Sequence, residues 1–342
     1  MPGDRRAEIE ALVTHYAAGN GRTQYNIYLK RLAKYRHHVE SVFAAHGLPR
    51  EFACVAMIES AVDPSRVSHA GAAGMWQFIP STARRYRLVV TDHVDQRFDP
   101  TLSTYAAAAY LRDLLLMFDG DFAPALGGYN GGEMMIASAL TSGPEGQDFW
   151  DLDPHGTAGS PGRTIPYETY DYVARFFAVA MIYQNLEVFG FEEPPAEDEP
   201  FVLAEVTGAV DIASLSEDLG LDPVHLATMN PSLMRGETDE DLPTAIRLPA
   251  RDVGDYVKLL RRHGRYRVSY VYRHKVTNYE SLRAIALDYG VPEAMIAAVN
   301  DLPYGPRLDE GTIVEVPAST RSEKAGWAAE RNRAWWEKRA ER

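Results

Sequence analysis

The chain has 342 residues, of which 46% are hydrophobic and 24% are charged. This composition excludes collagen, coiled-coil rods and wholesale disorder, and the length favours two or three domains. The formal net charge of -13 argues against a general nucleic-acid binder, because affinity for phosphates needs clustered Lys and Arg. Cys54 is the single cysteine, so the chain can form neither an internal disulfide nor a multi-cysteine zinc site.

The N-terminal residues are polar and are not followed by the apolar core of a signal peptide. No segment approaches the roughly 20 consecutive apolar residues that a membrane-spanning helix needs. Residues 105–117 come closest, but Arg112 and Asp113 interrupt them. We therefore expect a chain without a signal peptide and without a membrane span.

Residues 24–190 are predicted to be helical, because apolar residues recur there at spacings of three and four. The first amphipathic stripe begins at Tyr25 and stops at Pro49. Residues 52–61 are too apolar for a surface helix and predict a short, buried one. Further helices are predicted over residues 104–118, 122–129 and 170–188.

The composition changes at residues 192–200, which are acidic and rich in proline, as expected for an extended linker. The two segments 201–250 and 266–318 then share the order strand, helix, helix, strand. Each has an asparagine close to its second helix, Asn230 in the first and Asn300 in the other. This internal repeat predicts two small α+β modules of βααβ type.

Three further segments complete the predicted organisation. Residues 1–24 are expected to form an N-terminal extension, and residues 251–265 connect the two modules. Residues 319–342 predict a charged C-terminal helix. It carries Trp327, Trp335 and Trp336. Packing of these tryptophans on the protein body is favoured over an interaction helix.

Several familiar catalytic motifs are missing from the sequence. It has no His-Glu-x-x-His zinc motif and no Gly-x-Ser-x-Gly nucleophile elbow. Residues 127–132 are rich in glycine, but no strand precedes them and no Lys-Ser/Thr follows, which argues against a phosphate loop. His37 and His38 lie on a predicted helix, and the sequence offers no third metal ligand near them. We expect no metal and no cofactor.

One carboxylate stands out at the end of the apolar run 54–58. Glu59 could be exposed or paired there, as most helix-end glutamates are. Alternatively, its apolar neighbours could desolvate it, which would raise its pKa and keep it protonated near neutral pH as a general acid. Asp63 follows one turn later, but Pro64 should end the helix, so Asp63 is interpreted as a helix-end or turn residue.

Four motifs in a fixed order give Glu59 a context. They are Glu59-Ser60 followed by residues 74–83 (GMWQFIPSTA), residues 95–100 (DQRFDP), residues 128–132 (GYNGG) and residues 166–173 (PYETYDYV). Together they resemble the goose-lysozyme-like soluble lytic transglycosylase (SLT) domain, and within it the type D branch of membrane-bound lytic murein transglycosylases. The resemblance implies a multi-domain protein with a mainly α, lysozyme-like catalytic domain over residues 25–191.

The C-terminal repeats resemble LysM modules, which bind glycans that contain N-acetylglucosamine. Residues 270–317 follow the LysM pattern, and residues 201–250 resemble a degenerate copy. The type D branch carries LysM repeats after its catalytic domain, so this resemblance agrees with the first one.

The resemblance implies a peptidoglycan lytic transglycosylase. Such an enzyme cleaves the β-1,4 bond between N-acetylmuramic acid and N-acetylglucosamine and forms 1,6-anhydro-muramic acid. Glu59 would be the catalytic residue. Five residues would bind the sugar: Ser68, Gln77, Tyr129, Asn130 and Tyr172. The partner would be peptidoglycan glycan strands in the periplasm or the outer-membrane-associated cell envelope. The sequence leaves the oligomeric state open and favours a monomer.

Three alternatives stay open at this point. The first is a muramidase or chitinase-like hydrolase on the same fold, the second is a wall-binding protein with weak or lost activity, and the third is a cytoplasmic structural protein. One departure from the family pattern concerns flexibility: Gly128 stands where the family usually has Ala, and with Gly131 it predicts a loop with more freedom.

Overall fold

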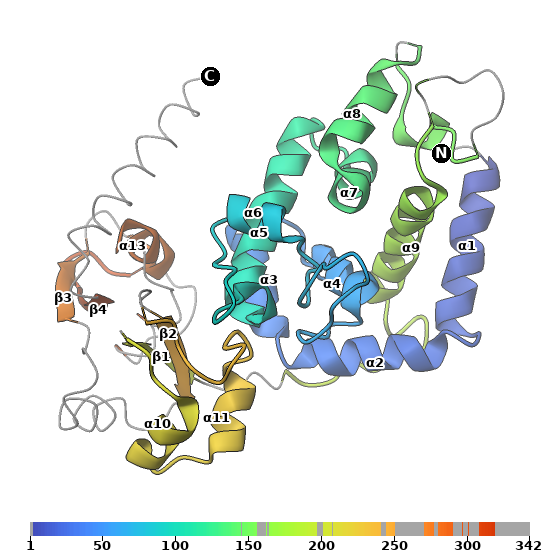
Figure 1. Cartoon of the computed structure of the whole chain (residues 1–342). Coiled ribbons are helices and arrows are strands. Elements are labelled where there is room, and N and C mark those ends of the chain that lie inside the picture. Colours follow the sequence, from blue (N-terminus) through green and yellow to red (C-terminus); the bar gives the residue numbers. More distant parts are fainter. Residues whose placement is uncertain are drawn as a thin grey trace. The chain divides into compact units, whose positions relative to one another are not determined.

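The computed structural model divides the chain into two compact units (Figure 1). The first comprises Met1–Thr91 and Asp95–Asp198, and the second comprises Asp92–Val94 and Glu199–Arg342. The structure describes residues 3–144, 146–155, 162, 164–196, 201–206, 208–240, 244–249, 270–276, 280–289, 296, 300 and 308–318. None of the helices in these ranges combines the length and the apolar character needed to cross a bilayer.

The first unit is mainly helical, as its apolar periodicity predicts. Its α-helices are α1 (Gly3–Ala17), α2 (Arg22–Ala33), α3 (Arg36–Ala45), α4 (Ala53–Ser60), α5 (Pro80–Arg85), α6 (Pro100–Met117), α7 (Phe122–Gly131), α8 (Glu133–Thr141) and α9 (Tyr167–Gln184). Short 3-10 turns, η1 (Arg50–Phe52), η2 (Gln96–Phe98) and η3 (Phe149–Asp151), lie between them.

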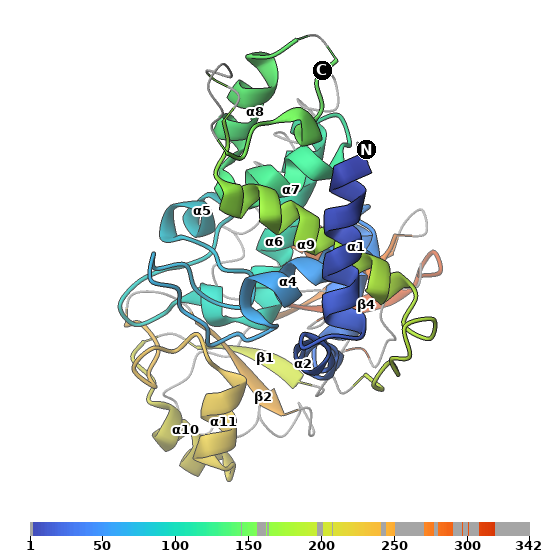
Figure 2. The ribbon, with the colours of Figure 1, turned by 90° about the vertical axis from the view of Figure 1, so that its right-hand side faces the viewer.

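Helix α1 is part of this unit rather than an extension of it. It runs beside α9 in both views (Figures 1 and 2). Ile9 and Tyr16 are buried, and Leu12 and Val13 pack against the same core. These four residues recur at helical spacing, a pattern that the expected extension over residues 1–24 left out. The compact unit therefore begins before residue 25, where the domain boundary was expected.

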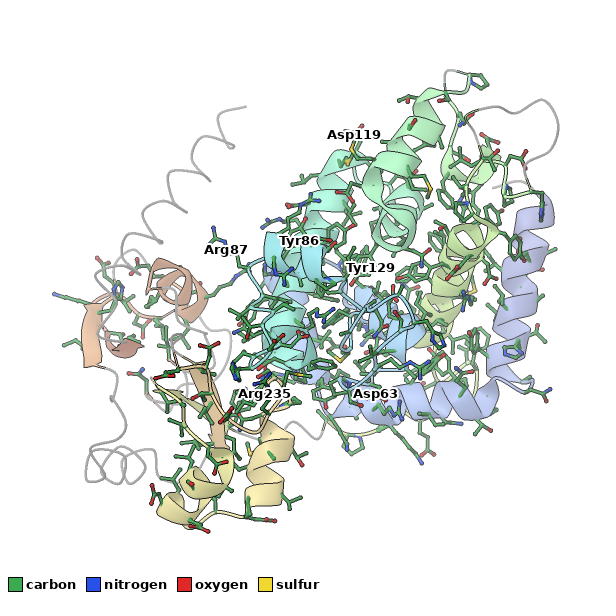
Figure 3. The ribbon with its side chains drawn as sticks, viewed as in Figure 1. Asp63, Tyr86, Arg87, Asp119, Tyr129 and Arg235 are labelled. Atoms are coloured by element: carbon green, nitrogen blue, oxygen red, sulfur yellow. The ribbon has the colours of Figure 1, made fainter. Side chains whose placement is uncertain are left out.

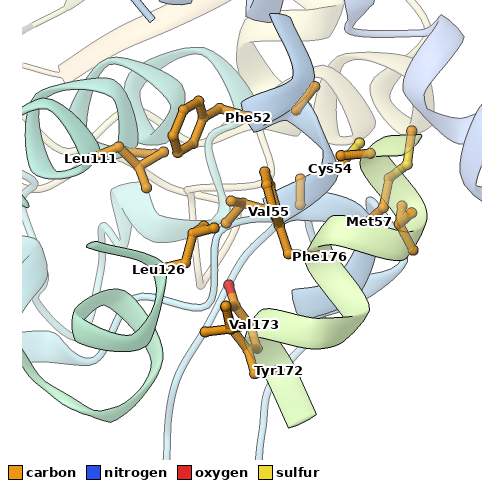
Figure 4. Close-up of a cluster of buried hydrophobic side chains, with 14 of the residues drawn as sticks. Phe52, Cys54, Val55, Met57, Leu111, Leu126, Tyr172, Val173 and Phe176 are labelled. Atoms are coloured by element: carbon orange, nitrogen blue, oxygen red, sulfur yellow. The ribbon is translucent and has the colours of Figure 1, made fainter. Parts of the chain in front are cut away.

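Helix α4 is the short buried helix that its apolar run predicts. Every residue from Ala53 to Met57 is inaccessible to solvent. Helix α9 packs on α4 with Tyr172, Val173 and Phe176 among the buried side chains (Figure 4). Burial of this kind contributes about 25 cal/mol per Å² of apolar surface, so α4 is held mainly by its neighbours and not by its own helix propensity.

The helix ends at Ser60 because the next two residues leave the right-handed region. Ala61 and Val62 have φ values of 57° and 56°, a conformation that costs a non-glycine residue about 1–2 kcal/mol. Val62 is nonetheless buried, and its N–H donates to the Ala56 carbonyl at 3.0 Å. Glu59 consequently lies in the last turn of α4, just before the chain reverses.

Residues 66–78, called the Gln77 loop below, follow this turn. The loop is narrow, with single antiparallel bridges from Ala73 to Val67 and to Phe78. Gly74 sits at its centre with φ of +82°, and a Cβ there would lie 1.7 Å from the main-chain oxygen of Arg97. Only glycine combines this backbone conformation with so close an approach.

Residues 127–131 are helical and are not part of a flexible loop. Helix α7 runs through Gly131, and a Cβ at that position would lie 2.6 Å from Met135 Cε and 2.8 Å from Thr169 Oγ1. The glycine therefore lets the end of α7 approach the first turn of α9. The expectation that Gly128 and Gly131 loosen a loop is wrong, because both residues belong to a packed helix.

The second unit contains two small modules. The first consists of β1 (Phe201–Val206), α10 (Ile212–Leu219), α11 (Pro223–Met229) and β2 (Thr244–Pro249), and the other contains β3 (Tyr270–Lys275), α13 (Leu282–Tyr289) and β4 (Ile313–Ala318). In each module the two strands pair antiparallel, with Phe201 opposite Pro249 and Tyr270 opposite Ala318. The first module thus has the expected strand–helix–helix–strand order.

The two modules share their buried positions as well as their strands. Four buried apolar pairs are separated by the same 70 residues: Val206 and Val276, Ile212 and Leu282, Leu215 and Ile285, Leu226 and Ile296. Asn230 and Asn300 keep this offset, and the side-chain amide of each donates to the carbonyl four residues earlier, at 2.8 and 2.7 Å. The internal repeat is therefore visible in the structure, while its LysM identity stays a prediction.

Several expected segments lie outside the described residues. These are residues 197–200 of the linker, the connector 251–265, most of the second helix of the other module, and the C-terminal helix expected over residues 319–342.

We predict that Gly74→Ala destabilises the protein by about 3 kcal/mol or more, because the new Cβ would meet the Arg97 main chain in a strained conformation. Gly71→Ala is the matched control. Gly71 also has positive φ, +79°, but nothing lies within 4 Å of its Cβ position, so this change should cost only about 1–2 kcal/mol. Urea unfolding measures both losses, and equal values would contradict the predicted clash.

Candidate active site

Glu59 is a half-buried carboxyl group at the C-terminal end of a buried helix. Burial, which disfavours the charged form, raises its pKa from 4.5 to about 7, and the charge of Glu168 acts in the same direction. Tyr172 and Arg175 lower this pKa but do not outweigh the burial. The structure thus favours a desolvated Glu59 over an exposed or paired one. A carboxyl group with this pKa can give and take a proton near neutral pH.

Tyr172 lies on the face of α9 that packs toward α4 (Figure 4). Its hydroxyl group is close enough to Glu59 to lower the pKa of that carboxyl, and the proximity of Glu59 adds to burial in raising the pKa of Tyr172. The hydroxyl is buried and has no partner in hydrogen-bond geometry among the described residues. An unsatisfied buried hydroxyl costs about 1–3 kcal/mol, so this group is available to a ligand or to the ionised carboxylate.

Tyr129 belongs to α7 and is labelled in Figure 3. The charge of Glu59 is the largest cause after burial of its raised pKa, which shows that the two groups are close. Its hydroxyl donates to the Trp76 carbonyl at 2.8 Å, and its ring lies 5.1 Å from that of Tyr110. Because its proton is engaged, Tyr129 can offer a sugar only the lone pairs of its oxygen and the surface of its ring.

Ser68 and Gln77 are both half-buried in the Gln77 loop. The Ser68 Oγ accepts a hydrogen bond from the Ala72 N–H at 3.1 Å, which leaves its own O–H free to donate. The Gln77 side chain donates from Nε2 to the carbonyls of Gly74 at 2.8 Å and Arg66 at 3.2 Å, which leaves its Oε1 as an acceptor. Part of the role of each residue is therefore to shape the loop.

Asn130 is half-buried in the last turn of α7, next to Tyr129. Its amide makes no hydrogen bond to any described residue. The structure thus brings Glu59, Tyr129 and Tyr172 together from three helices. It shows no direct contact of Asn130, Ser68 or Gln77 with Glu59, so their role in sugar binding stays a prediction.

Asp63 has the turn role that Pro64 predicts. Its Oδ1 accepts from the N–H of Ser65 at 2.9 Å and from the Ser65 hydroxyl at 2.6 Å. Although burial acts in the opposite direction, these hydrogen bonds hold the pKa of Asp63 below its ordinary value. The carboxylate, labelled in Figure 3, also has its Oδ2 3.9 Å from Nη1 of Arg31 in α2. These contacts keep Asp63 ionised and occupied within its own turn.

Two charged residues that influence Glu59 were not found from the sequence. Arg175 and Glu168 both belong to α9, and their charges shift the pKa of Glu59 in opposite directions. Arg175 also forms an ion pair with Asp171 one turn earlier, with Nε 2.8 Å from Oδ2. Arg175 follows Tyr172 by three residues, so it shares a helix face with it, and this spacing was the signal in the sequence.

Comparison with known proteins agrees with this site. Residues 44–149 match the family model of the transglycosylase SLT domain. Membrane-bound lytic murein transglycosylase D of Escherichia coli K12 is 31% identical over 226 residues, which cover 65% of this chain and 47% of that protein. The chain thus spans about half the length of this curated relative.

Two further proteins show a more distant similarity. The peptidoglycan transglycosylase gp16 of Escherichia phage T7 is 37% identical over 103 residues, or 30% of this chain and 8% of that protein. The solved 70 kDa soluble lytic transglycosylase of Escherichia coli is 20% identical, covers 46% of this chain and 25% of that chain, and has a TM-score of 0.36.

The matched range contains α4 with Glu59, the complete Gln77 loop and Tyr129, and Tyr172 follows in α9. The similarity to the transglycosylase SLT domain thus covers residues 44–149.

Proposed function

We propose that the chain is a lytic murein transglycosylase, which cleaves the β-1,4 bond between N-acetylmuramic acid and N-acetylglucosamine in peptidoglycan. The observation that carries this proposal is the Glu59 carboxyl, half-buried at the end of α4 with a pKa of about 7, inside an SLT domain. A group of this kind suits proton transfer to a glycosidic oxygen.

The reaction that fits this site uses one carboxyl group and no water. Most glycosidases place two carboxyl groups about 5–9.5 Å apart across the scissile bond, but Asp63 is occupied by Ser65. In the proposed first step, Glu59 gives its proton to the glycosidic oxygen as the C1–O bond breaks. The 2-acetamido oxygen of the sugar shields the cation that develops at C1.

In the second step, the Glu59 carboxylate takes the proton of the sugar 6-hydroxyl as that oxygen bonds to C1. The product is 1,6-anhydro-muramic acid, and Glu59 ends with its proton restored. An oriented intramolecular hydroxyl has an effective molarity on the order of 10⁵ M or more, so it can outcompete water. The Tyr172 hydroxyl is suited to donate to Glu59 while that group is ionised, since it is close enough to lower the pKa of that carboxyl.

The residues around Glu59 offer groups that complement an N-acetyl sugar. Ser68 has a hydroxyl proton to donate, and Gln77 has a side-chain carbonyl oxygen to accept. The side-chain amide of Asn130 can both donate and accept. We place the protein at the cell envelope, with peptidoglycan strands as its partner. The two modules of the second unit would bind the glycan as LysM-like domains, which the conserved 70-residue offset of their buried residues supports.

Glu59→Gln keeps the shape of the side chain and replaces the ionisable carboxyl group with an amide that cannot act as a general acid. We expect release of soluble fragments from purified murein to fall by about 10³-fold, within the usual contribution of general acid–base catalysis. Asp63→Asn is the control, and it should retain most of the activity because Asp63 is occupied in its turn. Digestion by Glu59→Gln at the wild-type rate would remove Glu59 from the mechanism.

The same digests distinguish the proposed reaction from its alternatives. Mass spectrometry should find muropeptides lighter than hydrolysis products by one water, because the 6-hydroxyl takes the place of water. Reducing-end products would identify a muramidase instead. Binding to murein without release of fragments would identify a wall-binding protein.

The pH dependence of the reaction should follow Glu59. Since the protonated form is the acid of the first step, kcat/KM is expected to fall as the pH rises through about 7. Initial rates of murein digestion at constant ionic strength measure this descending limb. A limb near 4.5, the ordinary value for a glutamate, would contradict the desolvation of Glu59.

Tyr172→Phe removes the unpartnered hydroxyl. Stability should not decrease, because the buried hydroxyl has no hydrogen-bond partner to lose, while kcat/KM falls about tenfold through loss of a hydrogen bond to the ionised Glu59. The descending limb should move to higher pH, because Tyr172 lowers the pKa of Glu59. Tyr25→Phe is the matched control: Tyr25 is buried and donates to the Val179 carbonyl at 3.0 Å. That change should cost about 1 kcal/mol of stability and leave the pH limb in place.

A further inference from the structure

The Gln77 loop is held from outside by side chains of three other segments, all of which donate to its backbone carbonyls. Ser60 of α4 donates to Met75 at 2.8 Å, and Tyr129 of α7 donates to Trp76 at 2.8 Å. The third donor is Arg97 in η2. Its Nη1 atom donates to the carbonyl of Gly71 at 2.8 Å and to that of Phe78 at 3.0 Å.

Arg97 holds two points of the loop at once, Gly71 near its middle and Phe78 at its end. Gly71 is joined to Ser68, since its N–H donates to the Ser68 carbonyl at 3.0 Å. Phe78 directly follows Gln77, and its N–H donates to Ala73 at 3.1 Å. One guanidinium group therefore holds the hydrogen-bonded neighbour of Ser68 and the residue that directly follows Gln77. Ser68 and Gln77 are the two residues of this loop proposed to bind the sugar.

The Arg97 side chain is itself firmly placed. It is only 8% exposed and forms an ion pair with Asp95, with Nε 3.0 Å from Oδ1 and Nη2 2.7 Å from Oδ2. A buried charge is costly unless it is paired and its remaining donors are satisfied. Here the carboxylate accepts from one edge of the guanidinium, and the two loop carbonyls accept from Nη1.

The main chain of Arg97 also touches the loop. Its carbonyl oxygen abuts Gly74, where even a Cβ would lie 1.7 Å away. The backbone of Arg97 thus fixes the position of Gly74, and its guanidinium holds Gly71 and Phe78 on either side of that glycine. Lysine could not replace this arrangement, because an ammonium group is a compact point charge and lacks the rigid fork that spans a carboxylate and two carbonyls.

We propose that Arg97, with Asp95, is a positioning residue for sugar binding: it holds the Gln77 loop in the shape that presents Ser68 and Gln77 to the substrate. This inference rests on the proposed function. The side chain of Arg97 bonds to Gly71, Phe78 and Asp95 and not to Glu59, Tyr129 or Tyr172, so we expect it to act on glycan binding and to leave proton transfer unchanged.

The test compares Arg97→Lys with the wild type in the full chain. The half-saturating murein concentration, KM, should rise about tenfold or more, because two charge-assisted hydrogen bonds to the loop are lost. The limiting rate should change little, and the descending pH limb should stay where Glu59 sets it. Arg36→Lys is the matched control, since Arg36 is also an arginine in an ion pair, 3.0 Å from Glu193 with 15% of its side chain exposed.

A second measurement does not depend on activity. Hydrogen exchange of the amides of residues 66–78 should be faster in Arg97→Lys than in the wild type, and unchanged in Arg36→Lys. If the wild type releases no murein fragments, the proposed function fails, but this exchange still tests whether Arg97 positions the loop.

The double variant Asp95→Asn with Arg97→Met covers the case in which Arg97→Lys does not fold. It removes both charges together, a change that proteins often tolerate, and it still cannot hold the two carbonyls. A raised KM with faster exchange in residues 66–78 would support the proposal. A wild-type KM, in either variant, would overturn it and leave Arg97 a purely structural role.

Discussion

The site depends on a carboxyl group that keeps its proton near neutral pH. That requires removing Glu59 from water, and its place at the end of a buried helix, where it is half-buried, meets this condition. The residues from Ala53 to Met57 exclude solvent, and the reversal at Ala61 and Val62 stops the helix directly after Glu59 and Ser60. Had α4 continued for another turn, Glu59 would lie in the middle of a helix packed on all sides.

Backbone strain around this site is offset by packing. Ala61, Val62 and Gln77 all have positive φ, which costs each non-glycine residue about 1–2 kcal/mol. Such conformations persist only where the surroundings determine them, and they gather at functional sites. Here the burial of Val62 and the hydrogen bonds of the Gln77 amide supply that support. The strain and the proposed sugar-binding residues thus occur in the same short stretch of chain.

The two modules of the second unit are repeats of one arrangement of strands and buried residues. Buried apolar residues recur 70 positions apart in the two modules, and each module pairs its two strands antiparallel. Asn230 and Asn300 repeat the same side-chain hydrogen bond. Because such a small module has few buried residues, each of these positions must carry an apolar side chain. This explains why the two modules share their burial pattern although their sequence identity is weak.

The sequence by itself determined the helical character of the first unit, the buried run before Glu59, the turn at Asp63 and the repeat in the second unit, because periodicity, proline and composition act locally. It did not determine the pKa of Glu59 or its proximity to Tyr129 and Tyr172. Those depend on three helices far apart in the chain. The prediction that Gly131 loosens a loop was also wrong, because this glycine lets α7 approach Thr169 closely. Burial and close approach are properties of neighbours, and only the tertiary structure decides which neighbours meet.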